Sequence, residues 1–263
     1  MRSIKKICAL LKKVKKRLLK LHFDTNTGHI GGNFSCIDTL IVLHHLVMKS
    51  SDRFILSKGH SAAALYLTLW SMGKISEEDL ETYAKDNTFF ACHPSGAKVP
   101  GLLFHTGSLG HGFSLATGLA MAAKHKKINR QIFCLCSDGE WQEGSCWEAL
   151  AFAVHHKLKN LTILIDENGL QGFNRVSEVI SGTDLKERIA AFGACVRRVD
   201  GHNLLEIKKG LTPPASGKPL VLILKTLKGH GLHFENLLES HYLPLTETQY
   251  NMALKKIDED LKL

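Results

Sequence analysis

The sequence predicts an α/β protein built in three layers, with a mainly parallel sheet between two layers of helices. Apolar runs of strand length alternate with stretches of helical periodicity, which is typical of a parallel sheet. The clearest strand–helix–strand unit spans 131–136, 145–156 and 161–165. Its crossover makes the two strands parallel and usually adjacent. At 263 residues the chain fits one sizeable domain, so we expect a single domain over residues 1–263.

The other expected elements follow from the same periodicities. A polar helix is expected at the C-terminal end, over 246–261. Ser76, followed by two acidic residues, is expected to cap a short helix. Residues 86–108, rich in Gly, Pro, His and Thr, are expected to form a long loop, and loops of this length are usually functional or disordered. The remaining expected helices are 4–21, 35–48, 61–72, 109–124, 185–192 and 204–210. The remaining expected strands are 52–57, 194–199 and 220–225. A polar, glycine-rich loop is expected over 25–33.

The first helix is amphipathic and strongly basic, and it carries much of the net charge of +9. Apolar residues recur at three- and four-residue steps from Ile4 to Leu21, with lysines between them. Helices that lie on membranes or nucleic acids have this pattern, and so do transit peptides. Most basic faces are simply solvated. We therefore expect a solvated face and neither nucleic acid nor membrane as a partner.

Composition narrows the class of protein further. No apolar run reaches membrane-spanning length, and no signal peptide pattern opens the chain. The seven cysteines are odd in number and lack paired spacing. Buried reduced thiols in a cytoplasmic protein are the plain interpretation, and a zinc site is not expected.

Two turns that follow the central strands carry the candidate chemistry. Asp138 follows the first strand of the unit and Asn168 the second. Because parallel strands end at the same edge of a sheet, both residues should reach the edge where open α/β folds bind ligands. A carboxylate, an amide oxygen and a nearby main-chain carbonyl suit a hard cation such as Mg²⁺. Asp-Gly and Asn-Gly are also common plain turns, so each turn alone is weak evidence.

Fifteen histidines are many for this length, and four of them lie in glycine-rich or loop contexts. Imidazoles can hold a sugar hydroxyl or an anion and can exchange protons near neutral pH. Spacing alone does not show that they converge. These four are His29, His60, His93 and His241.

Residues 137–149, followed by Asn160-Leu161 and 166–171, resemble the thiamine diphosphate signature in the form that occurs in transketolases. Further matches in transketolase order occur at 28–32, 52–60, 93–94 and 106–110. The match spans nearly the whole chain but only the amino-terminal, diphosphate-binding third of a full-length transketolase. The chain thus resembles the smaller subunit of a split, two-polypeptide transketolase. The resemblance implies a diphosphate-binding domain fold and transfer of a two-carbon ketol unit from a ketose phosphate to an aldose phosphate.

The resemblance also implies a role for individual residues. Metal ligands for Mg²⁺ or Ca²⁺ would be Asp138, Asn168 and the Leu170 carbonyl. The Gly139 amide would contact the diphosphate, and His60, Gly107, Ser108 and Leu109 would line thiamine diphosphate. The donor sugar would be surrounded by His29, His93 and His241, and His241 would also touch the cofactor. Glu143 and Glu148 match glutamates that link two active sites across the family's dimer interface.

A partner is implied as well, because the glutamate that starts the reaction belongs to a pyrimidine-binding domain that is missing here. The chain alone should be inactive. With a separate pyrimidine-domain subunit we expect a heterotetramer, and a homodimer of this chain is the alternative. The helices after Leu109 and Gly144 are the candidate contact surfaces.

Departures from the family pattern leave two alternatives open. Ser137 replaces a usual glycine, which is tolerable if its φ is negative, Tyr242 follows His241 where transketolases prefer glycine, and 172–174 differ as well. A transketolase-like enzyme acting on another substrate fits these departures. A cofactor-free binding module is the second alternative.

Overall fold

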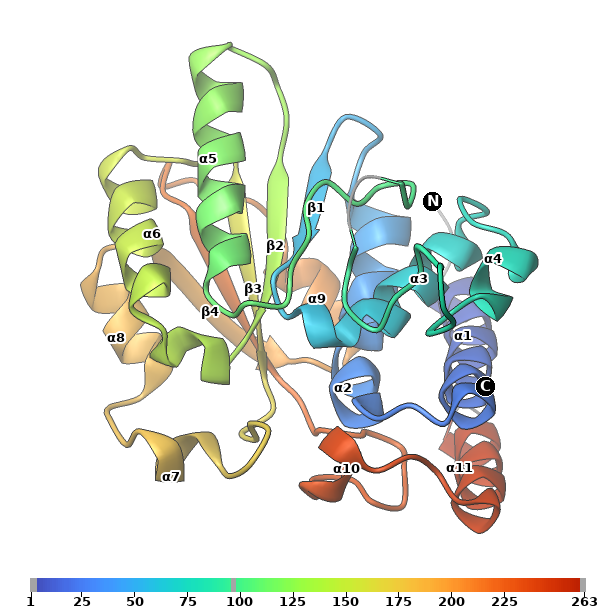
Figure 1. The fold of residues 1–263 in the computed structure, drawn as a ribbon. Coiled ribbons are helices and arrows are strands. Elements are labelled where there is room, and N and C mark those ends of the chain that lie inside the picture. The colour runs from blue at the N-terminus through green and yellow to red at the C-terminus, as the bar shows by residue number, and fades with distance from the viewer. Residues whose placement is uncertain (1–3, 96–97, 261–263) are drawn as a thin grey trace.

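The computed structural model describes residues 4–95 and 98–260. Within them, five parallel strands form one sheet in the order β1-β2-β3-β5-β4 (Figure 1). β2 and β3 pair in parallel register from Ile132 opposite Leu161 to Ser137 opposite Asp166, so the expected central unit is confirmed. The strands are β1 (Arg53–Leu56), β2 (Ile132–Ser137), β3 (Leu161–Glu167), β4 (Cys195–Asp200) and β5 (Leu220–Lys225).

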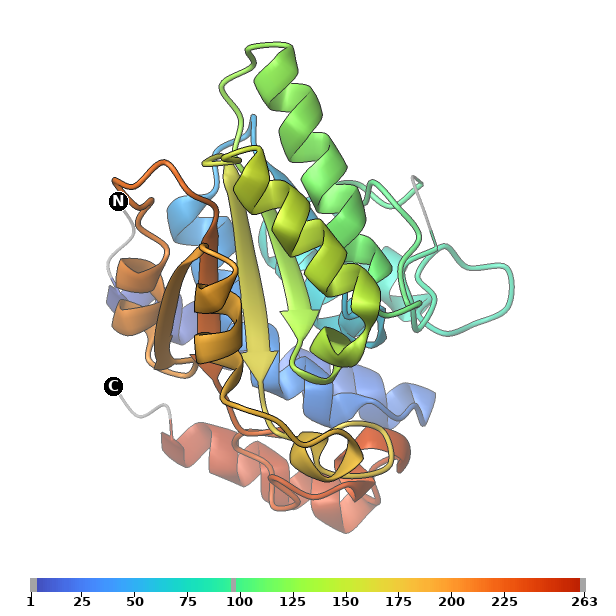
Figure 2. The same ribbon diagram turned by 90° about the vertical axis from the view of Figure 1, so that its left-hand side faces the viewer.

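Helices cover both faces of this sheet, as the three-layer prediction requires (Figures 1 and 2). Successive strand residues point to opposite faces, so each strand contributes to two cores. In β2, Phe133 and Leu135 join one core, while Cys134 and Cys136 join the other. The first core is covered by α1 (Ile4–Thr25), α2 (Ile30–Val42), α3 (Ala62–Ser71), α4 (Glu77–Glu81), α9 (Leu204–Gly210) and α11 (Glu247–Asp260). The second is covered by α5 (His111–His125), α6 (Gly144–His155) and α8 (Leu185–Ala191).

The glycine-rich loop near the N-terminus is shorter than expected. α2 begins at Ile30, so Gly31 and Gly32 are helical, and His29 caps the helix with a left-handed φ of 64°. α2 continues into a π-helical turn, η1 (Leu43–Val47), and is buried from end to end. The cap by Ser76 is confirmed, since its hydroxyl accepts the Asp79 backbone N–H and the Asp79 carboxylate accepts the Ser76 N–H.

Several short helices were not expected. They arise where the chain turns close to the sheet edge, and their sequences are too short to show a period. They are the 3₁₀ turns η2 (Gly59–Ser61) and η3 (Gly139–Gln142), and the single α-turns α7 (Val176–Val179) and α10 (Glu239–Tyr242). The last residue of the expected C-terminal helix, 261, lies outside the described residues.

The prediction that the basic face of α1 is solvated was wrong in part. Lys15 is 7% exposed and its ammonium lies 2.8 Å from the Asp38 carboxylate of α2. Lys12 and Lys16 both pair with Asp258 of α11, which packs along α1. Part of the basic pattern thus serves helix packing, because lysine stems can cover apolar surface while their ammonium groups reach carboxylates.

One apolar stretch does reach membrane-spanning length, contrary to the sequence-based expectation. Residues 30–47 pass by length and mean hydropathy, and 83% of this stretch is buried inside the molecule. Burial against the sheet and the surrounding helices accounts for its apolar character, as for any central helix of a core.

Candidate active site

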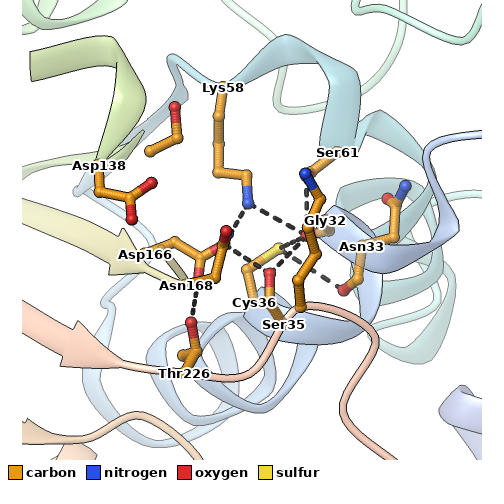
Figure 3. A network of polar contacts seen from close by, with 12 residues as sticks. Gly32, Asn33, Ser35, Cys36, Lys58, Ser61, Asp138, Asp166, Asn168 and Thr226 are labelled. Carbon is orange, nitrogen blue, oxygen red and sulfur yellow. Dashed lines mark hydrogen bonds and ion pairs between the residues drawn. The ribbon is translucent and has the colours of Figure 1, made fainter. Parts of the chain in front are cut away.

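Asp138 and Asn168 lie together at the carboxyl edge of the sheet, as their positions after β2 and β3 predicted (Figure 3). One carboxylate oxygen of Asp138 accepts the Gly139 backbone N–H at 2.8 Å. The other accepts the Gly169 backbone N–H at 2.6 Å, which ties the turn after β2 to the turn after β3. The convergence of the two strand ends is therefore confirmed.

The Asp138 carboxylate sits in an unfavourable place for a negative charge. Burial raises its pKa to about 7, against the lowering effect of the Gly169 and Gly139 N–H groups. The charge of the neighbouring Asp166 contributes to this raised pKa. A buried carboxylate of this kind is stabilised by a bound cation, and a divalent ion at this position would supply that stabilisation.

Two more oxygens complete the donor set that the sequence indicated. The Asn168 side-chain oxygen accepts the Leu170 backbone N–H at 3.1 Å and keeps a second lone pair. The Leu170 carbonyl accepts the Lys228 ammonium at 3.3 Å, so this oxygen already attracts a positive charge. Carboxylate, amide and carbonyl oxygens are the ligands that Mg²⁺ and Ca²⁺ prefer, and the residues present fit such an ion.

Lys228 is a residue that the sequence analysis missed. Its ammonium also donates to the Gln171 carbonyl at 3.1 Å and lies 2.9 Å from Nδ1 of His241. Burial and, to a lesser degree, the nearby Lys58 ammonium lower the pKa of Lys228 to about 8. A buried lysine beside Asp138 and Leu170 suits an anion such as a diphosphate bound next to a metal ion. Its position within Lys228-Gly229-His230-Gly231 is the only feature of the sequence that could have indicated it.

A buried ion pair between Lys58 and Asp166 lies next to Asp138 and Asn168 (Figure 3). Both side chains are fully buried. Burial alone would raise the pKa of Asp166, but the Lys58 ammonium and hydrogen bonds from Lys58, Ser35 and Thr226 hold it below its usual value. Sequence reasoning passed over this pair, because the two residues are far apart in the chain.

A cavity of about 280 Å³ opens beside these oxygens, and the four loop histidines line it. The rings of His29 and His241 are 4.8 Å apart and those of His29 and His93 5.7 Å apart, between centroids. The His60 ring is 6.0 Å from His29 and 5.8 Å from His241. The remaining lining residues are Gly107, Leu109, Ser137, Gly139, Asn168, Leu170, Gln171, Gly172, Phe173 and Lys228.

All four imidazoles are held in their neutral form. Burial lowers the pKa of His241 to about 3, helped by Lys228, and it lowers the pKa of His60 well below the usual value. Burial also lowers the pKa values of His29 and His93. Neutral imidazoles can accept a proton or a hydrogen bond from a hydroxyl, which is the property a sugar site needs.

Glycines shape the walls of this cavity. Gly107 has a φ of 142°, and a Cβ there would lie 3.0 Å from the ring of His93. A Cβ on Gly139 would meet the Gln171 side chain at 2.8 Å. The Gly139 N–H itself is bonded to Asp138 in this structure. A chain with side chains at these positions would fill the space beside the oxygens and the histidines.

The structure places some predicted residues outside the cavity. Ser108 is exposed and does not line it, although its neighbours Gly107 and Leu109 do. Glu143, which caps α6, and Glu148 are exposed as well. Within the described chain, no hydrogen bond or ion pair joins these glutamates to a cavity-lining residue, and their interface role stays a prediction.

The departures from the family pattern have clear positions. Ser137 is the last residue of β2, and its φ is not positive. A glycine is therefore not required at this position. The Tyr242 hydroxyl lies against Gly172, where a Cβ would approach it to 2.5 Å. Tyr242 also packs edge-on against His241, with ring centroids 4.6 Å apart. His241 thus reaches the cavity despite the loosely matched sequence around it.

A second group of ligand-type side chains, Asp38, His202 and His230, does not fit a metal ion. The two imidazole rings are stacked 3.6 Å apart and nearly parallel, so their in-plane lone pairs do not converge on one point. His202 also has both nitrogens engaged, by Asp38 and by the Leu227 N–H. These contacts make the group structural.

Comparison with known proteins agrees with the geometry. The family model "Transketolase, thiamine diphosphate binding domain" matches residues 22–260. The chain is 36% identical to one subunit of the apulose-4-phosphate transketolase of Phocaeicola vulgatus, over 95% of this chain and 93% of that protein. It is 34% identical to the 6-deoxy-6-sulfo-D-fructose transketolase subunit SqwG of a Clostridium species, over 94% of each.

Solved structures show the same relationship. Transketolase from Campylobacter jejuni superposes with a TM-score of 0.86 at 30% identity, covering 100% of this chain and 44% of that one. Transketolase from Leishmania mexicana gives 0.88 at 26% identity, with 42% of its chain covered. The chain therefore spans about two fifths of the length of these enzymes and belongs to the transketolase family, as its thiamine diphosphate-binding domain.

Proposed function

We propose that this chain is the diphosphate-binding subunit of a two-subunit transketolase that moves a two-carbon ketol unit from a ketose to an aldose. The supporting observation is that Asn168 and Leu170 line one cavity with four neutral histidines, while the turn that carries them holds the Asp138 carboxylate through the Gly169 N–H. Relatives of nearly equal length whose names describe them as transketolase subunits support the two-polypeptide arrangement. The partner would carry the pyrimidine-binding domain.

The residues of this chain would act by binding and by holding protons. Asp138, Asn168 and Leu170 would hold Mg²⁺ or Ca²⁺, and Lys228 and the Gly139 turn would face the diphosphate. Thiamine diphosphate, when bound, supplies the carbon nucleophile and the electron sink for cleaving the bond next to the ketose carbonyl. His29 and His93 are neutral and can accept protons from the sugar hydroxyls at their ring nitrogens. His241 accepts the Lys228 ammonium at Nδ1, so its neutral ring carries a proton on Nε2 that can be donated to a sugar oxygen. His60 would hold the cofactor in place.

The proposed donor is a ketose. Two observations favour a ketose other than the usual pentose phosphates. The relatives from Phocaeicola and Clostridium carry the names of an apulose 4-phosphate and a sulfofructose enzyme. Tyr242, which stands where transketolases prefer glycine, fills the space over Gly172. A ketose whose distal end differs from that of a pentose phosphate is the second candidate, on the same cofactor chemistry.

The test is reconstitution with the pyrimidine-domain subunit of the same organism. The isolated chain should bind little thiamine diphosphate and show no ketol transfer, and the purified complex should show both in the presence of Mg²⁺. Donors tested in parallel should include pentose and hexose ketose phosphates, apulose 4-phosphate and 6-deoxy-6-sulfofructose. Transfer by this chain alone would refute the two-subunit proposal, and a complex that binds no cofactor would refute the function.

A further inference from the structure

Asp166, near the end of β3, gathers hydrogen-bond donors from four segments of the chain (Figure 3). One carboxylate oxygen accepts the Lys58 ammonium, the Ser35 hydroxyl at 2.5 Å and the Asn168 amide NH₂ at 3.2 Å. The other oxygen accepts the Thr226 hydroxyl. These donors come from α2 and from the turns after β1, β3 and β5. Asp166 itself is fully buried and does not line the cavity.

The contact to Asn168 decides which end of its amide faces the cation site. An ionised carboxylate only accepts hydrogen bonds, so the amide end beside Asp166 must be the NH₂ group. The opposite end accepts the Leu170 N–H at 3.1 Å, which independently requires it to be the oxygen. Two contacts on opposite ends of the amide therefore agree on one orientation. That orientation leaves an oxygen lone pair of Asn168 for a metal ion.

We propose that Asp166 is a positioning residue for the divalent cation: it holds the Asn168 amide so that its oxygen, and not its NH₂ group, faces the ion. The inference rests on the proposed function. A rotated amide would present two N–H donors to a cation and repel it. Partners of this kind, behind a metal ligand, typically change metal affinity 10- to 100-fold.

Lys58 has to be treated together with Asp166 in any test. Removing the carboxylate alone would leave the fully buried Lys58 ammonium without its counter-charge, which destabilises a fold for reasons unrelated to the metal. Replacing both members by uncharged side chains of similar volume avoids that effect. The Lys58→Met background therefore allows position 166 to be varied without leaving a buried charge.

The experiment compares two matched double variants in the complex of this chain with its pyrimidine-domain subunit. Lys58→Met/Asp166→Asn keeps a carbonyl oxygen that can accept the Asn168 NH₂ group. Lys58→Met/Asp166→Leu has nearly the same shape and no acceptor. Mn²⁺ binding is measured by electron paramagnetic resonance with thiamine diphosphate present, and the melting temperature of the metal-free complex is measured alongside. Thr226→Val removes a donor to the other oxygen of Asp166 and serves as the control for damage to the network.

The Leu variant should bind Mn²⁺ at least tenfold more weakly than the Asn variant, while their metal-free melting temperatures stay close. Thr226→Val should remain within about threefold of wild type, as should the Asn variant. Equal Mn²⁺ affinities in the Leu and Asn variants would overturn the proposal. So would an equal loss in Thr226→Val, because it would show general damage to the network.

A second variant keeps the test decisive if the Leu variant does not assemble. Lys58→Met/Asp166→Val also lacks an acceptor at position 166, and valine is smaller than leucine. It should bind Mn²⁺ at least tenfold more weakly than the Asn variant. Equal Mn²⁺ affinities in the Val and Asn variants would overturn the inference. A wild-type complex that binds no Mn²⁺ with cofactor would refute the proposed function itself, whereas equal affinities in the variants refute only the role of Asp166.

Discussion

The carboxylate of Asp138 is held at 2.6 Å by the backbone N–H of Gly169, across the gap between two neighbouring strand ends. A residue that follows β2 is thus oriented by the turn that follows β3. The bond aims a buried carboxylate before any cation is bound, and burial raises its pKa to about 7. A buried carboxylate with a raised pKa thus lies where the proposed metal ion would bind, and such perturbed pKa values are common at functional sites.

Asp138→Asn should separate function from stability. The folded-state pKa of Asp138 lies above its usual value of 3.8, so the stability that its protonated form contributes is present at low pH and is lost as pH rises through about 7. At pH 8 the metal-free Asn variant should therefore melt no lower than wild type. Its Mn²⁺ affinity in the assembled complex should fall at least tenfold. A variant that binds Mn²⁺ as tightly as wild type would contradict the assignment of Asp138 as a ligand.

Gly107→Ala should disturb the histidine cavity. The φ of 142° is strained for alanine, and its Cβ would lie 3.0 Å from the His93 ring. We expect a loss of about 1–3 kcal/mol in the free energy of unfolding and at least a tenfold fall in kcat/KM for ketol transfer by the complex. Urea denaturation and a transfer assay measure the two effects.

Gly217→Ala is the matched control for that substitution. Gly217 also has a positive φ, of 68°, but nothing lies within 4 Å of a Cβ there. It should cost about 1 kcal/mol of stability and leave transfer unchanged. If both variants lost the same activity, displacement of His93 would not be the cause.

Lys15→Ala should destabilise the chain far more than Lys12→Ala, although both lie on α1. Lys15 is the buried partner of Asp38, which would keep only its contact with His202. A loss of about 3 kcal/mol is expected for Lys15 because a buried carboxylate loses its counter-charge. Lys12 forms a partly exposed pair with Asp258, and its removal should cost less than about 1 kcal/mol. Equal losses in urea denaturation would show that the basic face of α1 has no buried member.

His44 should make the protein sensitive to acid. Burial lowers its pKa from 6.5 to about 4, so the folded state binds fewer protons than the unfolded state between these values. The stability contributed by neutral His44 is present above pH 6.5 and is lost as pH falls towards 4. Because raised carboxyl pKa values such as that of Asp138 act in the opposite direction, the difference between wild type and His44→Leu is the quantity to measure.

As pH falls, wild type should lose more of its free energy of unfolding than His44→Leu does. Urea denaturation at pH 7, 6, 5 and 4.5 should show wild type losing about 2–3 kcal/mol of stability relative to His44→Leu across this series. Any loss of the His44 hydrogen bond to the Leu40 carbonyl appears equally at every pH and cancels. A difference that does not change with pH would contradict the buried neutral imidazole.

The parallel sheet and the pairing of its two central strands could be predicted because strand and helix periodicities are local. The same local reasoning found Asp138 and Asn168, since a βαβ crossover brings their strand ends together. It failed where the chain forms single helical turns, as at α7 and α10, and where the first turn of a helix contains glycines, as Gly31 and Gly32 do in α2. It also treated Lys15 as a surface residue, because a lysine on an amphipathic helix shows no sign of its partner.

The sequence by itself determined the layered α/β fold, the pair of strand-end oxygens and the resemblance to transketolases, because each depends on short spacings along the chain. Only the tertiary structure decided that four histidines from separate segments share one cavity, and that Lys58, Asp166 and Lys228 support the same edge of the sheet. Lys58 and Asp166 are 108 positions apart and meet only because the sheet order places β1, β2 and β3 next to one another. Contacts of that kind depend on how elements pack, and no local pattern encodes them.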